Sequence, residues 1–334
     1  MSENNLLFYM RAFLNAKLFK KRAPLFIGWD ITNRCNSDCK YCGITAQWPE
    51  ELDTQKAMLL IDGLYSLGMK RINFGGGEPL LREDLGEIID KCKRYNIFVT
   101  VITNGALFEK RSLWLKKVDF VKISLDGPED IHDDIRQRKG SYREVIHAIE
   151  ISKKLGIDIA LNTTLSRYNL DCVDFILSLV SDFDIPVKFQ PVNNLLSGSK
   201  NIEDALCPQE QYVKIIEKLI QYKKSDYKNR IINSIAGLRY LKNYPAVSEL
   251  ACCAGLLLFR IDPAGNIYRC SGAADKSYPI GSDASPLVSR LKDVMNCMPV
   301  KSCKRCLCTA SLELQLAYSG RPTAIKELLN NFWN

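Results

Sequence analysis

The chain has 334 residues, 46% of them hydrophobic, and a formal net charge of +8, so it is long enough to bury its own core without disulfide bonds. The charge is modest for this length, and no basic stripe with interleaved aromatic residues occurs, which argues against nucleic-acid binding. Thirteen cysteines without a secretory signal predict reduced thiols in a cytoplasmic location, where clustered cysteines usually bind metal or act in catalysis.

The N-terminal segment, residues 1–23, predicts an amphipathic helix. Its apolar side is formed by Leu6, Leu7, Met10, Phe13 and Leu14. Arg11 interrupts the apolar stretch and the lysines follow it, which is unlike a signal peptide or a membrane span. Packing on the rest of the fold is the favoured interpretation; the alternative is peripheral contact with an anionic membrane surface.

Residues 24–207 alternate short apolar runs with longer helical patterns, as parallel β–α–β units do. Six strands are expected, at Leu25–Thr32, Arg71–Phe74, Phe98–Thr103, Phe120–Leu125, Ile157–Thr163 and Val187–Pro191. Helices such as Asp53–Leu67 and Arg143–Leu155 lie between them. We therefore expect an α/β fold, a partial (β/α)6 TIM-like barrel, with the active site in the loops that follow the strands.

Three further segments follow the barrel. Residues 208–250 predict a helical connector. Residues 251–309 are rich in cysteine and turn formers and predict a small auxiliary-cluster domain. Residues 310–334 predict a C-terminal helix.

A cysteine cluster follows the first expected strand. Cys35, Cys39 and Cys42 form a CxxxCxxC pattern without a nearby histidine. Structural zinc usually takes four ligands, often from two CxxC pairs. Three thiolates instead suit a 4Fe-4S cluster with one iron open to another ligand.

Three polar or glycine-rich motifs end the next strands: Gly75–Pro79 (GGGEP), Thr103–Gly105 (TNG) and Ser124–Pro128 (SLDGP). Each alone is an ordinary turn. In this order after the cysteines, over roughly residues 24–200, they resemble the radical S-adenosylmethionine (SAM) superfamily. The resemblance implies that SAM binds the open iron and is cleaved reductively to a 5′-deoxyadenosyl radical, with an electron donor such as flavodoxin or ferredoxin.

The same resemblance implies a set of SAM contacts. They are Tyr41, Gly76, Gly77, Glu78, Thr103, Asn104, Ser124, Asp126, Arg136 and Asn162. Within it, Glu78 would accept a hydrogen bond from the methionyl ammonium, and Arg136 would pair with the carboxylate. Gln190 would face the substrate. Asn162 and Gln190 could equally satisfy neighbouring backbone groups.

The cysteines of the C-terminal third resemble the Twitch form of the SPASM-like auxiliary domains found after such barrels. The expected ligands of a second 4Fe-4S cluster are Cys253, Cys270, Cys303 and Cys306, with Cys252 and Cys308 as alternates. A hairpin with a cysteine at each end, plus a CxxC turn, can supply four thiolates. A structural zinc on the same thiolates is the alternative.

The expected function is therefore reductive SAM cleavage followed by hydrogen abstraction, for an oxidation or other C–H modification. The substrate stays open between a peptide, a sugar-like small molecule and a lipid. The alternative function is a non-catalytic iron–sulfur or zinc binding module. The ordered motifs argue against that alternative, since a scaffold does not need them.

Overall fold

Eight strands form the framework of the fold in the part of the chain that the structure describes. The computed structural model describes residues 3–44, 50–192, 202–225, 227–244, 249–270, 277–280, 286–300, 306, 308–321 and 324. The strands are β1 (Phe26–Thr32), β2 (Arg71–Gly76), β3 (Phe98–Thr103), β4 (Phe120–Ser124), β5 (Ile159–Leu165), β6 (Val187–Pro191), β7 (Leu258–Ile261) and β8 (Ile267–Tyr268).

These strands form one open sheet, in the order β6-β5-β4-β3-β2-β1-β7-β8. All neighbours from β6 to β7 are parallel, and only β8 is antiparallel. The six expected strands are present with small shifts at their ends, so the predicted partial barrel is confirmed. The sheet also gains β7 beside β1, from the cysteine-rich segment expected to form a separate domain. That hairpin continues the barrel sheet.

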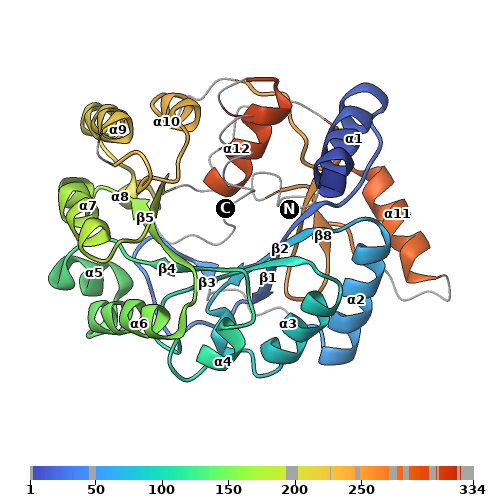
Figure 1. Cartoon of the computed structure of the whole chain (residues 1–334), viewed down its shortest axis with the longest axis horizontal. Coiled ribbons are helices and arrows are strands. Elements are labelled where there is room, and N and C mark those ends of the chain that lie inside the picture. The colour runs from blue at the N-terminus through green and yellow to red at the C-terminus, as the bar shows by residue number, and fades with distance from the viewer. Residues whose placement is uncertain are drawn as a thin grey trace.

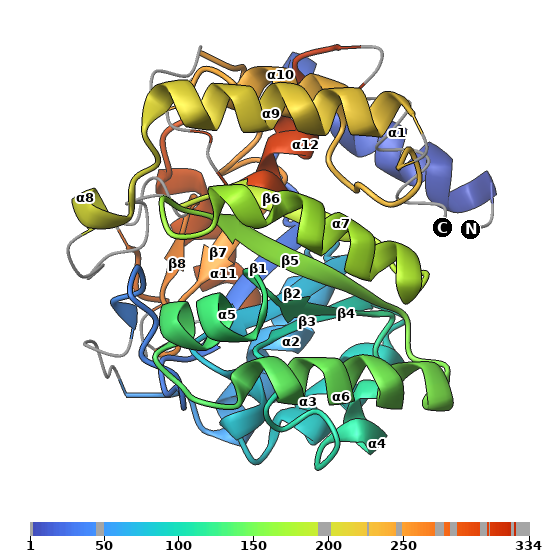
Figure 2. The same cartoon turned by 90° about the vertical axis from the view of Figure 1, so that its left-hand side faces the viewer.

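Helices cover both sides of the sheet. They are α1 (Glu3–Phe19), α2 (Thr54–Ser66), α3 (Leu85–Arg94), α4 (Ser112–Leu115), α5 (Glu129–Arg136), α6 (Ser141–Leu155), α7 (Val173–Asp182), α8 (Ile202–Ala205), α9 (Gln209–Lys224), α10 (Ile235–Leu241), α11 (Leu287–Cys297) and α12 (Thr309–Tyr318), with 3₁₀ turns at Pro79–Leu81 and Leu170–Cys172. Figure 1 shows α2 to α6 outside the curve of the sheet and α12 on its inner side. Figure 2, turned by 90°, shows α9, α10 and α1 on that same side, opposite α3, α4 and α6.

The outer face of the sheet is apolar and fully buried. Trp29, Phe74 and Phe189 alternate with residues of the inner face and pack in the main core with residues of the outer helices, such as Ile61 of α2. This period-two pattern gives each strand one apolar face. The inner face, by contrast, carries mostly polar side chains and glycines, so it is the face available for chemistry.

Helix α1 packs by one side only. Ala16 is buried in a second cluster with Leu25, Leu256 and Tyr318, and Phe13 packs against it. The helix thus packs on the rest of the fold, but not by the whole apolar side expected from the sequence, because Met10 and Leu14 of that side are exposed. No helix within the described ranges is long and apolar enough to cross a membrane.

Candidate functional site

The carboxyl ends of β1 to β4 bring the predicted motifs together. Residues 33–43, here called the cluster loop, follow β1 and carry Cys35, Cys39 and Cys42. The GGGEP motif ends β2, TNG ends β3 and SLDGP ends β4. Because carboxyl ends of parallel strands share one edge of the sheet, all four motifs meet at that edge.

The glycines of β2 permit a close approach to the cluster loop. The Gly77 amide donates to the Thr32 carbonyl at 2.8 Å, and the Glu78 amide donates to the Arg34 carbonyl at 2.8 Å. A Cβ on Gly76 would lie 2.3 Å from the Thr32 oxygen, and one on Gly77 would lie 2.2 Å from the Arg34 oxygen. Any side chain there would push the two backbones apart, so these glycines fix the cluster loop against the sheet.

Glu78 links β2 to β3 from a buried position. Its side chain is 1% exposed, and its carboxylate accepts from the Thr103 hydroxyl at 2.8 Å, the Asn104 amide at 2.7 Å and the Leu80 amide at 3.1 Å. Burial raises the pKa of this carboxyl, although these three donors favour the charged form. Glu78 therefore stabilises the turn that contains Asn104.

Asn104 in turn reaches the cluster loop. Its side-chain amide donates to Asn36 Oδ1 at 2.6 Å and to Ser37 Oγ at 3.3 Å. The TNG motif thus holds the segment between Cys35 and Cys39, an interaction that the sequence does not reveal.

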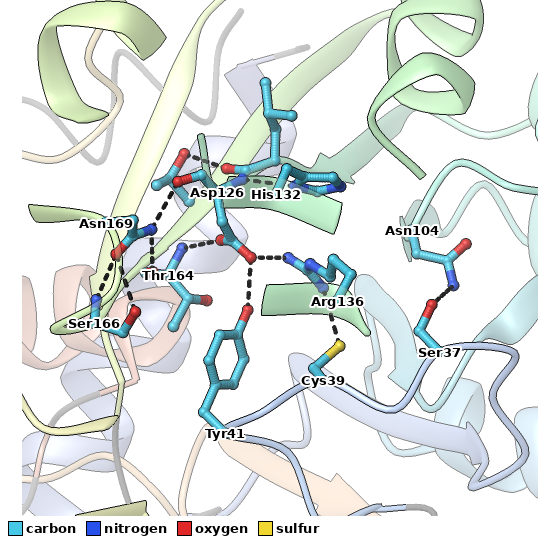
Figure 3. A network of polar contacts seen from close by, with 12 residues as sticks. Ser37, Cys39, Tyr41, Asn104, Asp126, His132, Arg136, Thr164, Ser166 and Asn169 are labelled. Carbon is cyan, nitrogen blue, oxygen red and sulfur yellow. Dashed lines mark hydrogen bonds and ion pairs between the residues drawn. The ribbon is translucent and has the colours of Figure 1, made fainter. Parts of the chain in front are cut away.

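Asp126, fully buried after β4, is the centre of a polar network (Figure 3). Its Oδ2 accepts from the Tyr41 hydroxyl at 2.9 Å and pairs with Arg136 Nη2 at 2.7 Å. Its Oδ1 accepts from the Thr164 amide at 3.0 Å, and its own amide donates to His132 Nδ1 at 3.1 Å. The network joins the cluster loop, β5 and α5 around one carboxylate.

Arg136 connects this network to the cysteines. Its Nη1 lies 3.8 Å from Cys39 Sγ, within hydrogen-bond distance for sulfur. Its Nε is buried without a hydrogen-bond partner in the described part of the chain. Asp126 thus orients the guanidinium toward a cysteine of the cluster loop. The N–H at Nε could donate a hydrogen bond to a bound ligand, and a carboxylate is a suitable acceptor.

Cys39 and Cys42 lie close enough to Cys35 to affect the ionisation of the Cys35 thiol. Burial, together with smaller effects of Glu78 and the neighbouring cysteines, raises the pKa of Cys35 to about 12; burial also raises the pKa of Cys42. Thiolates here consequently need a metal partner. Among the described residues no three His, Cys, Asp or Glu side chains are placed to hold a single metal ion. In a zinc site the cysteine sulfurs would be only about 3.8 Å apart. The all-thiol donor set of Cys35, Cys39 and Cys42 fits an iron–sulfur cluster.

The remaining predicted contacts lie in neighbouring rows of the inner face. Ser124 of β4 pairs in register with Asn162 of β5, which pairs with Lys188 of β6. Thr164 pairs with Gln190, whose amide donates to the Thr164 hydroxyl at 3.3 Å. Ser124 and Asn162 thus lie side by side, with Gln190 one row nearer the carboxyl edge.

Charged residues of the inner face were missed from the sequence. Lys122 lies on β4 and the buried Lys188 on β6; burial and then Lys188 lower the pKa of Lys122 to about 7. A signal was present, because the runs 121–124 (VKIS) and 187–190 (VKFQ) alternate polar and apolar residues, whereas parallel strands covered on both faces are usually apolar throughout.

Strands β7 and β8, which extend the sheet beside β1, bring a second set of charged residues together. Arg260 of β7 pairs with Asp30 of β1 at 2.5 Å, and the Tyr268 hydroxyl of β8 donates to the same carboxylate at 3.2 Å. These contacts depend on the pairing of β7 with β1, which sequence analysis did not anticipate.

The C-terminal cysteines are only partly within the described residues. Cys253 is fully buried, and Cys252 and Cys270 lie close enough to raise its pKa further, after the larger effect of burial. Cys306 packs against the main core, and Cys308 precedes α12. Although burial opposes it, Arg260, Ser311 and Lys188 lower the pKa of Cys308. The predicted ligand Cys303 lies outside the described residues.

Comparison with known proteins finds a family model that matches most of the barrel. Residues 29–180 match the family model described as the Radical SAM superfamily. The Fe-coproporphyrin III synthase of Methanosarcina barkeri is 30% identical over 198 residues, which cover 57% of this chain and 49% of that protein. The AdoMet-dependent heme synthase of Oleidesulfovibrio alaskensis is 34% identical, over 43% of this chain and 39% of that protein.

A third relative matches over a longer stretch. The mycofactocin maturase MftC of Mycolicibacterium smegmatis is 27% identical over 270 residues, which cover 78% of this chain and 67% of that protein. The chain therefore spans between about two fifths and two thirds of the length of these three relatives.

Solved structures show the same fold at low identity. The structure titled anSMEcpe with bound AdoMet superimposes with a TM-score of 0.64 at 18% identity, covering 81% of this chain and 80% of that one. Streptococcus suis SuiB bound to the precursor peptide SuiA gives 0.64 at 14% identity, covering 86% and 70%. Both likenesses extend beyond the barrel into the C-terminal part of the chain.

Proposed function

We propose that this chain is a radical SAM enzyme, because its residues 29–180 match the Radical SAM superfamily model, and that it cleaves SAM reductively and abstracts a hydrogen atom from a substrate bound at the inner face of the sheet. When bound, a 4Fe-4S cluster supplies the electron for this cleavage. Cys35, Cys39 and Cys42 would hold the cluster. A reduced flavodoxin or ferredoxin would supply the electron to it.

The protein's own contribution is to orient SAM and exclude water. The observation that carries this proposal is Arg136, held by Asp126, adjacent to Cys39, with its buried Nε unpartnered in the described part of the chain. This guanidinium would bind the SAM carboxylate, while Ser124 and Asn162 supply neutral polar contacts beside it. The glycines of the GGGEP motif and Glu78 would keep the cluster loop at the distance that this contact requires.

A cysteine variant tests the proposal. Anaerobically reconstituted protein, given SAM and dithionite, is expected to form 5′-deoxyadenosine, and Cys39→Ala is expected to abolish it because the cluster loses one of three ligands. Cys297→Ala, at an exposed cysteine outside both predicted clusters, is the matched control and should retain formation. Product formation by Cys39→Ala at the rate of the control contradicts the proposal. Intact iron without any product in the unmodified protein supports the non-catalytic binding module instead.

For the reaction, we propose an oxidation or C–H modification of an acidic small molecule or peptide. The names of two relatives refer to iron coproporphyrin III and heme synthesis, and a structural neighbour was solved with a precursor peptide. These compounds share carboxylate groups. A second 4Fe-4S cluster on Cys253, Cys270, Cys303 and Cys306 would take up the electron that an oxidation releases.

We also propose that α1 contacts an anionic membrane surface. Met10, Leu14 and Leu18 follow one another at intervals of four residues and are 51%, 55% and 66% exposed, so they form one apolar stripe on the side of α1 that faces away from the core. Exposed basic residues, among them Lys17, Lys20 and Lys21, lie in the last turn of α1 and directly after it. An apolar stripe with adjacent lysines suits the interface of an anionic bilayer.

Vesicle binding tests this surface. Leu14→Glu with Leu18→Glu is expected to reduce co-sedimentation with phosphatidylserine vesicles by about tenfold, because two apolar groups are replaced by anions at an anionic surface. Leu113→Glu is the matched control, since Leu113 is 77% exposed on α4, and it should bind as the unmodified protein does. Equal sedimentation of all three proteins would rule out α1 as the contact.

A further inference from the structure

Two lysines of the inner face have no role in the SAM site described above. Lys122 of β4 is partly buried, and Lys188 of β6 is 6% exposed. Nowhere in the described ranges does either ammonium form an ion pair or a hydrogen bond; the ion pairs found there join other residues. Both side chains belong to the polar set of their strands and point away from the outer core.

The electrostatic surroundings of Lys122 are predominantly positive. Lys188 and Arg71 act as like charges on Lys122, and the Cys308 thiol is the group that opposes them. Lys188, by contrast, faces the acidic groups Glu313 and Cys308, and the Glu313 carboxylate also accepts from the Ser234 amide at 3.0 Å. Arg260, which also acts on Cys308, is neutralised by Asp30. Among the described residues no carboxylate lies within ion-pair distance of either ammonium, and a buried ammonium without an ion pair is costly, so this pair is suited to receive an anion.

The position of the pair relates it to the proposed SAM contacts. Lys188 lies in the same row as Asn162 and Ser124, and Lys122 precedes Ser124 by two residues on β4. Adjacent strands are about 4.8 Å apart, so an anion between the two ammonium groups would lie beside Asn162. It would be one row deeper in the barrel than Gln190 and Thr164.

We propose that Lys122 and Lys188 bind a carboxylate group of the substrate, with the Asn162 amide beside it, and so anchor an acidic substrate next to SAM. This inference rests on the proposed function and names its substrate class. No bond changes at this anchor; it supplies binding energy and orientation. Carboxylate is the chemistry proposed, and a phosphate group is the other source of negative charge that the test separates from it.

Thermal unfolding of the reconstituted protein in three sodium salts of equal ionic strength tests the anchor, with acetate and inorganic phosphate as probes and chloride as the reference. Acetate is expected to raise the Tm of the unmodified protein by about 2 °C over chloride, since a ligand that binds only the folded state stabilises it. Lys122→Met and Lys188→Met should lose this shift. Lys122→Met should also unfold at a higher temperature than the unmodified protein in chloride, because a cation that lies near two like charges, Lys188 and Arg71, is removed.

Lys116→Met is the matched control, at an exposed lysine outside the barrel, and should keep the full acetate shift. An acetate shift of equal size in the inner-face variants, or none in the unmodified protein, would overturn the proposal; a shift with phosphate alone would replace carboxylate by phosphate. Loss of iron in the variants would show that the lysines compensate the charge of a cluster, which also overturns it. Formation of 5′-deoxyadenosine without added substrate, measured in the same samples, reports separately on the proposed function.

Discussion

The residue that connects most of the site is Asp126. Its single carboxylate fixes Tyr41 of the cluster loop, Arg136 of α5 and the backbone of β5. A buried ion pair is favourable only where further hydrogen bonds satisfy its remaining lone pairs, as they do here. The resemblance to radical SAM proteins assigns Asp126 and Tyr41 to SAM binding, and the structure adds that each side chain is committed to a protein partner.

His132 is the titratable neighbour of this network, and its pH dependence can be predicted. Burial, and then repulsion by Arg136, lower the pKa of His132 to about 4, below the value of about 6.5 in an unfolded chain. Its contribution to stability is therefore fully present above about pH 6.5 and is lost as the pH falls toward 4. Between about pH 7 and pH 4 the free energy of unfolding should fall by about 3 kcal/mol more in the unmodified protein than in His132→Asn, which cannot titrate.

Urea denaturation at several pH values measures this difference. The side-chain amide oxygen that His132→Asn introduces can still accept from the Asp126 amide, so the variant should fold. His147→Asn, at the exposed histidine of α6, controls for the loss of an imidazole at the surface. Its free energy of unfolding should change with pH as that of the unmodified protein does. Parallel pH profiles for all three proteins would exclude His132 as a titrating group.

At the scale of elements, the glycine-rich end of β2 holds the cluster loop. Gly76 has a φ of +105° and a backbone oxygen 2.3 Å from where its Cβ would be, whereas Gly140, at the start of α6, has a φ of +84° with nothing within 4 Å. Alanine at either position is strained by its φ, but only Gly76→Ala adds a collision between backbones.

Comparison of the two alanine variants isolates that collision. Gly140→Ala is expected to cost about 1 kcal/mol of unfolding free energy, and Gly76→Ala about 1–3 kcal/mol more. Gly76→Ala should also retain less iron, because the cluster loop must move away from β2. Chemical denaturation and iron analysis measure both effects; equal costs and equal iron in the two variants would contradict the structural role of Gly76.

For the whole molecule, the number of clusters is the main prediction. With a SAM-binding cluster and an auxiliary cluster, the reconstituted chain should hold about eight irons. Cys270→Ala should lower this to about four, since one of the four predicted auxiliary ligands is removed, while the Cys297→Ala control stays at about eight. Iron and sulfide analysis, together with quantification of other metals, measures the number of clusters per chain. Zinc in place of four irons would support the structural-zinc alternative, and unchanged iron in Cys270→Ala would remove Cys270 from the ligands.

Local patterns were sufficient to predict the order of the barrel strands and the family whose model residues 29–180 match. Strand and helix periodicity depend on local spacing, so the six strands could be predicted from residues 24–207, and CxxxCxxC, GGGEP and SLDGP are local motifs. The same reasoning placed a turn-rich segment around Cys253 and Cys270. It could not assign the cysteines that form one site, because that depends on contacts between distant segments.

Three features depend on tertiary contacts that no local pattern encodes. Strand β7 joins β1 across more than 220 residues of chain, and this pairing brings Arg260 to Asp30. The network around Asp126 likewise joins residues from four separate segments. The direction in which Lys122 and Lys188 point follows from strand register, because a side chain reaches the inner or the outer face according to its place in the pleat, and register is set by the whole packed sheet.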